Sequence, residues 1–484
     1  MRVRRFLIAA AGLAVLCVLA STAAWAQIPQ GIEKLTHILV IYLENRSFNN
    51  LFGEFPGANG IANAGSAAIQ RNRAGEPYAK LPPVPNPFKV MQNPIGLYAL
   101  PAIENLPNKP FAIDGLPYGV TPKTYTRDLT HAFYTNKAQI NGGKNDRFVA
   151  YSNAGALTMG YYSEASLQDS NLWKLARDYR LLDNFFQGAF GGSFFNHMWL
   201  VCACAPEWPN PPANLRSKPN PDGSMQDGRV TAVADGDYAV NTTQSVFLNN
   251  GKQGGDLLPS QTKPTIGDRL TAKGVDWVWY SGGWNLAIKA NRSPEEQQVL
   301  DKNEFQWHHQ PFAYFERFNP MRQSGRDERA KHLKDAIELE ADIRTGKLPP
   351  IAFYKPVGVL NQHPGYANLV EADEEVGRIV HLMQTSPMKA SYAIIITYDE
   401  HGGFFDHARP PEPADSGDRA DFFGPGTRVP AILVSPFVRK GLDHSQYDTT
   451  SIARFIADRH RLDPLNSPRF KAVESLAKAF DFSR

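Results

Sequence analysis

Apolar, β-branched runs alternate along the chain with segments patterned as amphipathic helices. The predicted strands are residues 37–43, 179–186, 275–280, 351–357, 392–398 and 429–437. Segments 327–346, 367–386 and 449–462 carry apolar residues with the 3.6-residue period of a helix. This alternation predicts an α/β fold with a mostly parallel central sheet. Ligands of such sheets bind at the carboxyl ends of the strands, where we look for functional residues.

Two long stretches interrupt the alternation. Residues 55–125 and 205–265 are rich in Pro, Gly and Asn and carry little periodicity. We interpret both as loop insertions on the surface of a rigid core, where substrate selectivity often resides. The sequence therefore predicts a single catalytic domain over residues 27–484 rather than several domains.

The first 26 residues have the pattern of a secretory signal peptide. A basic start, MRVRR, is followed by the apolar residues 6–20 and by a small-residue cleavage pattern at Ala24 and Ala26. We expect an exported protein, periplasmic or secreted, with no transmembrane segment in the mature chain. General and twin-arginine export both stay open. Cys17 follows a leucine rather than a small residue, so we expect no lipid anchor.

Charge and cysteine content narrow the possible functions. Removal of the signal peptide takes away three arginines and leaves 48 basic residues against 48 acidic ones. A chain without basic excess is a poor nucleic-acid binder, so we expect no nucleic-acid partner. Cys202 and Cys204 remain, and on a helix their side chains would diverge. We expect two small buried residues there and no bridge.

Acidic and amide side chains follow two of the predicted strands. Glu44 and Asn45 come directly after 37–43, and Asp399 and Glu400 come directly after 392–398. Neighbouring carboxylates repel each other unless a cation neutralises them, and hard oxygen ligands favour Ca²⁺, Mg²⁺ or Mn²⁺. The ordinary alternatives are an Asx turn at the first pair and a solvated loop at the second.

A serine and four histidines add candidate chemistry. Ser193 follows two glycines and opens an apolar, helix-like run, where the helix dipole and free N–H groups favour attack on a phosphate. The alternative is an ordinary N-cap serine. Imidazoles can bind phosphoryl oxygens or protonate a leaving group, and each one can equally be structural. The candidates are His131, His308, His309 and His363.

Three motifs, in order, carry a family resemblance. They are ENRSFNNLFG (44–53), FGGSFFNHMWL (190–200) and TYDEHGGFFDHARPP (397–411). The chain resembles, from about residue 35 to 440, the bacterial phosphoesterase family of secreted acid phosphatases and phosphatidylcholine-type phospholipases C. The nucleophile segment is most similar to that of the acid phosphatase branch.

The resemblance implies a fold like that of alkaline phosphatase and the sulfatases, a three-layer α/β sandwich. It implies one divalent metal ion and Ser193 as nucleophile, with Asn45, His131, His363 and one of His308 and His309 binding the phosphoryl group. The implied metal ligands are Glu44, Asn45, Ser193, Asp399 and Glu400. We expect His401, Asp406 and His407 to be structural.

The sequence thus favours a secreted acid phosphatase that hydrolyses phosphomonoesters through a phosphoserine. The nearest alternative is a phospholipase C that cleaves phosphodiesters of phospholipids. A sulfatase is disfavoured because no Cys-x-Pro-x-Arg segment is present. A non-catalytic secreted binding protein on the same fold is the alternative of another class.

Overall fold

The computed structural model describes residues 28–84, 104–115, 118, 120–248, 257–412 and 421–483. The predicted signal peptide lies outside the described residues. Among the described helices, none has the length and apolar character needed to cross a membrane.

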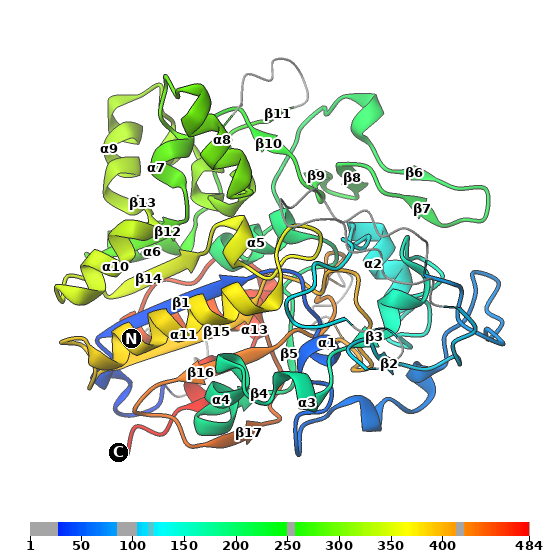
Figure 1. The fold of residues 1–484 in the computed structure, drawn as a ribbon. Helices are drawn as coiled ribbons and strands as arrows, with labels where there is room; N and C mark the ends of the chain where they lie inside the picture. Colours follow the sequence, from blue (N-terminus) through cyan, green and yellow to red (C-terminus); the bar gives the residue numbers. More distant parts are fainter. Residues whose placement is uncertain are drawn as a thin grey trace, which may run out of the picture.

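An eight-stranded sheet forms the centre of the molecule (Figure 1). In spatial order its strands are β13 (Leu333–Asp335), β12 (Trp277–Ser281), β14 (Ile351–Lys355), β1 (His37–Leu43), β15 (Tyr392–Tyr398), β16 (Ala431–Val434), β4 (Arg180–Leu182) and β17 (Gly441–Asp443). Only β16 runs antiparallel to its neighbours in this sheet. The predicted α/β fold with a mostly parallel sheet is confirmed.

The two central strands explain where the core lies. β1 and β15 pair in parallel register over seven residues and are buried almost throughout, as expected for strands covered on both faces. Leu43 lies opposite Tyr398, so the chain leaves both strands at the same level of the sheet. Glu44 and Asp399 are therefore neighbours at the carboxyl edge.

Helices cover both faces of the sheet. One layer contains α4 (Asn171–Asp178), α10 (Ala336–Arg344) and α11 (Leu369–Thr385), which contact one another in series and lie in front of the strands in Figure 1. The other contains α5 (Ser193–Cys202), α6 (Ile266–Ala272), α12 (Thr449–His460) and α13 (Pro468–Ala472). The remaining α-helices are α1 (Phe48–Phe52), α2 (Phe133–Ile140), α3 (Glu164–Leu167), α7 (Trp284–Ala287), α8 (Pro294–Lys302) and α9 (Gln323–His332).

The prediction of one helix over 327–346 is wrong. α9 ends at His332, Leu333–Asp335 form the edge strand β13 beside β12, and α10 starts afterwards. Asp335 is the N-cap of α10 and forms a capping box with Glu338. The helical periodicity of apolar residues continues through the break. The Asp-x-x-Glu spacing of a capping box nevertheless indicates that a new helix begins at this point.

The predicted strand 179–186 is likewise two short strands. β4 joins the central sheet, whereas β5 (Phe185–Phe186) pairs with β18 (Tyr447–Asp448). The chain between them bends, and Asp183 is buried there. This single apolar run therefore supplies one strand to each of two different sheets.

The two insertions differ in structure. Residues 205–265 contain short strands outside the central sheet (Figure 1): β6 (Lys218–Pro219), β7 (Met225–Gln226), β8 (Val230–Val233), β9 (Gly236–Ala239), β10 (Gln244–Ser245) and β11 (Leu257–Leu258). The described part of 55–125 contains turns, two short 3-10 helices (Ile61–Asn63 and Gly65–Ala68) and β2 (Phe111–Ala112), which pairs with β3 (Gly160–Tyr161). Residues 85–103 lie outside the described residues.

The expectation for the cysteines is wrong, because Cys202 and Cys204 form a disulfide. Cys202 ends α5, and Ala203 adopts a left-handed conformation with φ of 49°. The chain reverses there, which brings the two Cα atoms to 5.1 Å. The prediction assumed that the helix continues through both residues.

Candidate metal and phosphate site

Three buried carboxylates meet at the carboxyl edge of β1 and β15. Glu44, Asp399 and Glu400 each expose 0% of their surface, as does Asn45. Asp399 Oδ1 accepts hydrogen bonds from the backbone N–H groups of Glu400 at 2.8 Å and Asn45 at 3.3 Å. The strand register therefore brings the two sequence motifs together in one cluster.

Ser193 reaches this cluster from the start of α5. Its Oγ lies 3.2 Å from Asn45 Oδ1 and 3.4 Å from Glu44 Oε2. Gly192, not Ser193, is the N-cap of α5, so the ordinary capping interpretation of this serine does not hold. The side chain faces the carboxylates instead of the helix.

All four candidate histidines lie around the same carboxylates. His309 Nε2 contacts Glu44 Oε1, and the ligand atoms of Glu44, His308 and His309 lie within 4.8 Å of one another. His363 Nε2 lies 3.7 Å from Glu44 Oε2. Sequence left open which of the adjacent histidines faces the site; the structure brings both to it.

His131 lies at the opposite end of the cluster. Its Nδ1 is 2.7 Å from Glu400 Oε1, and its Nε2 is 3.3 Å from Asp128 Oδ1. The ligand atoms of Asp128, His131 and His363 also lie within 4.8 Å of one another. The site thus has a buried, oxygen-rich end at Glu44 and a partly exposed end at Asp128.

The protonation of the histidines differs between the two ends. Burial opposes the charged form of His131, but Glu400 and Asp128 together raise its pKa well above the ordinary value. Burial lowers the pKa of His309 to about 4 despite the Glu44 charge, and it lowers that of His308 well below its ordinary value. These shifts favour the charged form of His131 and the neutral forms of His308 and His309.

Sequence reasoning missed three residues of this site. Lys355 Nζ lies 2.7 Å from Glu44 Oε1, and His197 Nδ1 lies 3.8 Å from Asp399 Oδ2. Asp128 pairs with His131. The available signals were a lysine ending the apolar run IAFYK, a histidine one helical turn after Ser193, and an Asp-x-x-His spacing.

Of the other polar residues of the TYDEHGGFFDH motif, Asp406 and His407 face away from the metal cluster, whereas His401 contacts Glu400. His401 lies 3.3 Å from Glu400 Oε2 and 3.1 Å from Gln187 Oε1. Asp406 forms a fully buried ion pair with Arg428 at 3.0 Å. His407 contacts Asn49 and Asn59 and no residue of the metal cluster. The contacts of Asp406 and His407 agree with the structural roles expected from the sequence, and the structural role of His401 stays a prediction.

The donor set suits a hard divalent cation. Three carboxylates, an amide oxygen and a hydroxyl lie at this buried edge of the sheet, where uncompensated negative charge is costly. Among the described residues, the groups of three ligand atoms within 4.8 Å are those of Glu44, His308 and His309 and of Asp128, His131 and His363. In the described part of the chain, Asn45 Nδ2 and His197 Nε2 are buried without a hydrogen-bond partner. Asn45 Nδ2 is a donor beside Ser193, which suits a bound phosphoryl oxygen. The residues therefore fit a metal ion together with a phosphate group.

Gly402 allows the second motif to approach the first. It has φ of 63°, and a Cβ at this position would lie 2.2 Å from the carbonyl oxygen of Asn45. Gly142 has nearly the same φ, 64°, and no atom within 4 Å of its Cβ position. Alanine substitutions at these two glycines can therefore separate the effect of backbone strain from the effect of close contact with the metal cluster.

We expect Gly402→Ala to reduce the free energy of unfolding by at least about 3 kcal/mol and to weaken metal binding. Gly142→Ala should cost only the strain of the left-handed conformation, about 1–2 kcal/mol, and should leave metal binding unchanged. Chemical denaturation and isothermal titration of both variants measure the difference. Equal losses in the two variants would show that the approach of Gly402 to Asn45 is unimportant.

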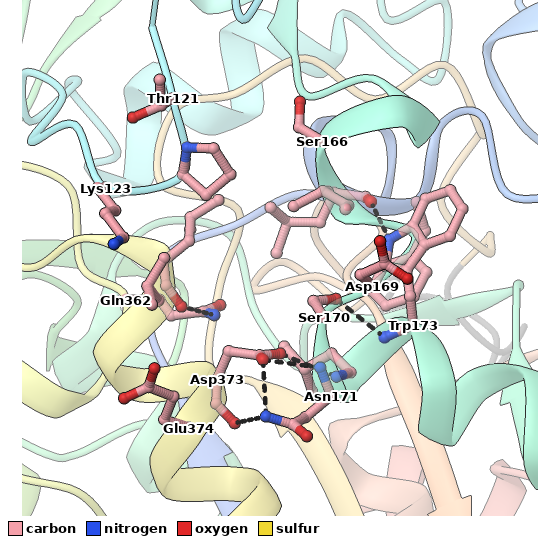
Figure 2. A pocket seen from close by; sticks show the side chains of 17 residues that line it. Thr121, Lys123, Ser166, Asp169, Ser170, Asn171, Trp173, Gln362, Asp373 and Glu374 are labelled. Atoms are coloured by element: carbon pink, nitrogen blue, oxygen red, sulfur yellow. Dashed lines mark hydrogen bonds between the residues drawn. The ribbon is translucent and has the colours of Figure 1, made fainter.

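A separate cavity of about 490 Å³ lies between α1, α4 and the start of α11 (Figure 2). Its wall is mainly apolar, with Trp173 on one side and the charged groups of Lys123 and Glu374 on another. None of the predicted site residues lines it; Gln362, which precedes His363 in the chain, is the nearest in sequence. This cavity is distinct from the metal cluster.

A serine, a ring of histidines and buried carboxylates at the carboxyl edge of a parallel sheet define a class of phosphoryl-transfer hydrolase. The sequence profile of the Phosphoesterase family matches residues 35–463. The chain belongs to the Phosphoesterase family and is thereby placed among the phosphoric ester hydrolases.

Curated relatives cover nearly the whole chain at low identity. The hemolytic phospholipase C of Pseudomonas aeruginosa is 24% identical and matches 93% of this chain and 56% of its own length. Phospholipase C A of Mycobacterium tuberculosis is 25% identical over 94% of this chain and 79% of its own. The non-hemolytic phospholipase C of Burkholderia pseudomallei is 25% identical over 93% and 60%. This chain thus spans between about half and four fifths of the length of these relatives.

Solved structures with a similar arrangement share little sequence. A protein of the alkaline phosphatase superfamily from Vibrio parahaemolyticus has a TM-score of 0.32 and 9% identity, covering 71% of this chain and 69% of that one. The lipoteichoic acid synthase LtaP of Listeria monocytogenes has a TM-score of 0.32 and 9% identity, covering 74% of each chain.

Proposed function

We propose that this protein is an exported, metal-dependent phosphoester hydrolase in which Ser193 is the nucleophile. The observation that carries the proposal is the position of Ser193 Oγ, 3.2 Å from Asn45 Oδ1 and 3.4 Å from Glu44 Oε2 at the start of a helix. Export rests on the signal-peptide pattern of residues 1–26. We also propose that residues 27–484 form a single catalytic domain.

Metal and substrate are assigned to different atoms of the cluster. The proposed metal ligands are Glu44, Asn45, Ser193, Asp399 and Glu400. When bound, a divalent ion supplies Lewis-acid charge to the serine hydroxyl and the phosphate. Ser193 attacks phosphorus and forms a phosphoserine, which water then hydrolyses. The donor Nδ2 of Asn45 binds an equatorial phosphoryl oxygen.

The histidines complete the phosphate site. His308 and His309, held neutral by burial, present N–H donors to the phosphoryl group. His363 Nδ1 donates to the carbonyl oxygen of Pro364, which leaves Nε2 facing Glu44 and the reacting phosphate. Nε2 of His363 therefore accepts the proton of the Ser193 hydroxyl as the serine attacks, and returns it to the leaving alkoxide. His131, whose charged form is favoured by Glu400 and Asp128, binds the negatively charged phosphate at the exposed end of the site.

For the substrate we place phospholipid phosphodiesters first and phosphomonoesters second. The three curated relatives described above are all named phospholipase C. The segment FGGSFFNHMWL, with Ser193, favours the acid phosphatase branch. The sequence alone favours an acid phosphatase over a phospholipase C. The names of the relatives support the opposite order, which we adopt in this proposal.

A side-by-side assay tests this order. We expect the protein to hydrolyse p-nitrophenylphosphorylcholine, a phosphodiester, at least about tenfold faster in kcat/KM than p-nitrophenyl phosphate, because about 1.4 kcal/mol of differential transition-state binding gives that ratio. A chelator should abolish both activities, and Mg²⁺, Mn²⁺ or Ca²⁺ should restore them. Preference for the monoester would identify an acid phosphatase. Turnover of neither substrate by the metal-loaded protein would favour a non-catalytic binder.

A further inference from the structure

Lys355 is a fully buried lysine at the centre of the metal cluster. It is the last residue of β14 and exposes 0% of its surface. Its Nζ lies 2.7 Å from Glu44 Oε1 and 3.5 Å from Asp399 Oδ2. A buried ammonium is stable only when opposite charge compensates it, so Lys355 and the carboxylates require one another.

The sheet topology explains this position. β1 lies between β14 and β15, and all three strands are parallel. Lys355 ends β14, while Glu44 and Asp399 come directly after β1 and β15. The register pairs Tyr354 with Ile41, so Lys355 lies two residues before the level of Glu44 and Asp399, and its long side chain spans that difference at the same edge of the sheet. Among the described residues, Lys355 is the one lysine or arginine with a recorded ion pair to Glu44, Asp399 or Glu400.

The contacts of Glu44 divide between its two oxygens. Oε1 faces Lys355 and His309, whereas Oε2 faces Ser193 and His363. Lys355 thus holds one oxygen and leaves the other directed at the serine. The ammonium of Lys355 lowers by one unit the negative charge that these carboxylates present to a bound cation.

We propose that Lys355 is a positioning residue that sets the valence of the metal centre, so that the site selects one divalent cation over a trivalent one. The inference rests on the metal site of the proposed function and extends it to the choice of ion. Without the ammonium, the same carboxylates would present one more unit of negative charge to the ion, which favours a trivalent ion over a divalent one.

The test measures metal binding to metal-free protein and not turnover. Ca²⁺ and Tb³⁺ are titrated separately, by calorimetry and by Tb³⁺ luminescence, into the wild type, Lys355→Met and Lys355→Gln. Methionine removes the charge and the hydrogen bonds at similar length, whereas glutamine keeps a hydrogen-bond donor without the charge. Lys334→Met is the matched control, because Lys334 pairs with Asp342 at 3.3 Å on β13.

We expect the ratio of Tb³⁺ to Ca²⁺ affinity to rise by about 10- to 100-fold in both Lys355 variants, since one charge at this range is removed from a low-dielectric site. Lys334→Met should keep the wild-type ratio. An unchanged ratio in Lys355→Met, or a wild-type ratio in Lys355→Gln, would overturn the proposal. The second result would mean that Lys355 acts through its hydrogen bond alone.

If Lys355→Met is too unstable for titration, the increase of its unfolding temperature by each saturating ion gives the same comparison. A larger increase with Tb³⁺ than with Ca²⁺, relative to the wild type, supports the proposal, and equal increases contradict it. A protein that binds metal with this selectivity but hydrolyses no phosphate ester would refute the proposed function and leave the role of Lys355 intact. A wild type that binds neither ion would refute both.

Discussion

Replacing Ser193 by alanine is expected to lower phosphoester turnover by at least about 10⁴-fold, because the nucleophile is lost while the rest of the site remains. The side chain is buried and contacts Glu44 and Asn45, so alanine leaves the carboxylates in place. The metal content of the variant, measured by elemental analysis, should stay at the wild-type stoichiometry. Steady-state kinetics with p-nitrophenyl substrates measure the loss.

Ser467→Ala is the control for this substitution. Ser467 is equally buried, at 4% exposure, and is the N-cap of α13, where it accepts a hydrogen bond from Phe470. Its replacement should cost about 1 kcal/mol of stability and leave turnover unchanged. If Ser193→Ala kept more than a tenth of wild-type activity, the nucleophile would have to be another group.

Asp399→Asn is expected to weaken metal binding on the order of 100-fold, because ligand charge largely sets the affinity of hard cations, and turnover should fall with it. Burial, and next the charge of Glu44, raise the pKa of Asp399 well above its ordinary value in the metal-free protein. Protons and the metal ion therefore compete for this carboxylate, so wild-type metal affinity should fall as pH falls. Calorimetry at two pH values measures both effects.

Asp406→Asn separates metal binding from folding in this motif. Asp406 is as buried as Asp399, but its partner is Arg428 and not the metal cluster. Loss of this ion pair should reduce stability by about 3–5 kcal/mol while the folded fraction keeps wild-type metal affinity. Equal loss of metal affinity in the two variants would contradict the division of the motif into a metal half and a structural half.

The pairing of the two acidic motifs was predictable because local pattern places each directly after a buried strand. Residues 37–43 and 392–398 match β1 and β15 at both ends, and helices over 369–385 and 449–460 lie within the predicted segments. The wrong predictions concern places where the backbone structure changes although the hydrophobic pattern of the sequence continues. The 327–346 segment breaks at Asp335, and the helix at Cys202 ends in a left-handed turn.

The positions of His308 and His309 could not be predicted from the local sequence pattern. His308 and His309 are adjacent in sequence, and a regular helix or strand would direct them to different sides. Both reach Glu44 because they lie in a short 3-10 turn (Trp307–His309), whose position depends on its packing against α5. The choice that sequence left open was therefore a question about tertiary packing.

The sequence by itself determined the fold class, the family and the two acidic pairs, since these depend on periodicity and on contiguous motifs. Only the tertiary structure decided that Lys355, His197 and Asp128 join them. Periodicity shows that a strand exists but not which strand lies beside it. Lys355 is separated from Glu44 by more than 300 residues, and only the order β14–β1–β15 makes them neighbours. The charge that surrounds the metal is therefore a property of the strand order.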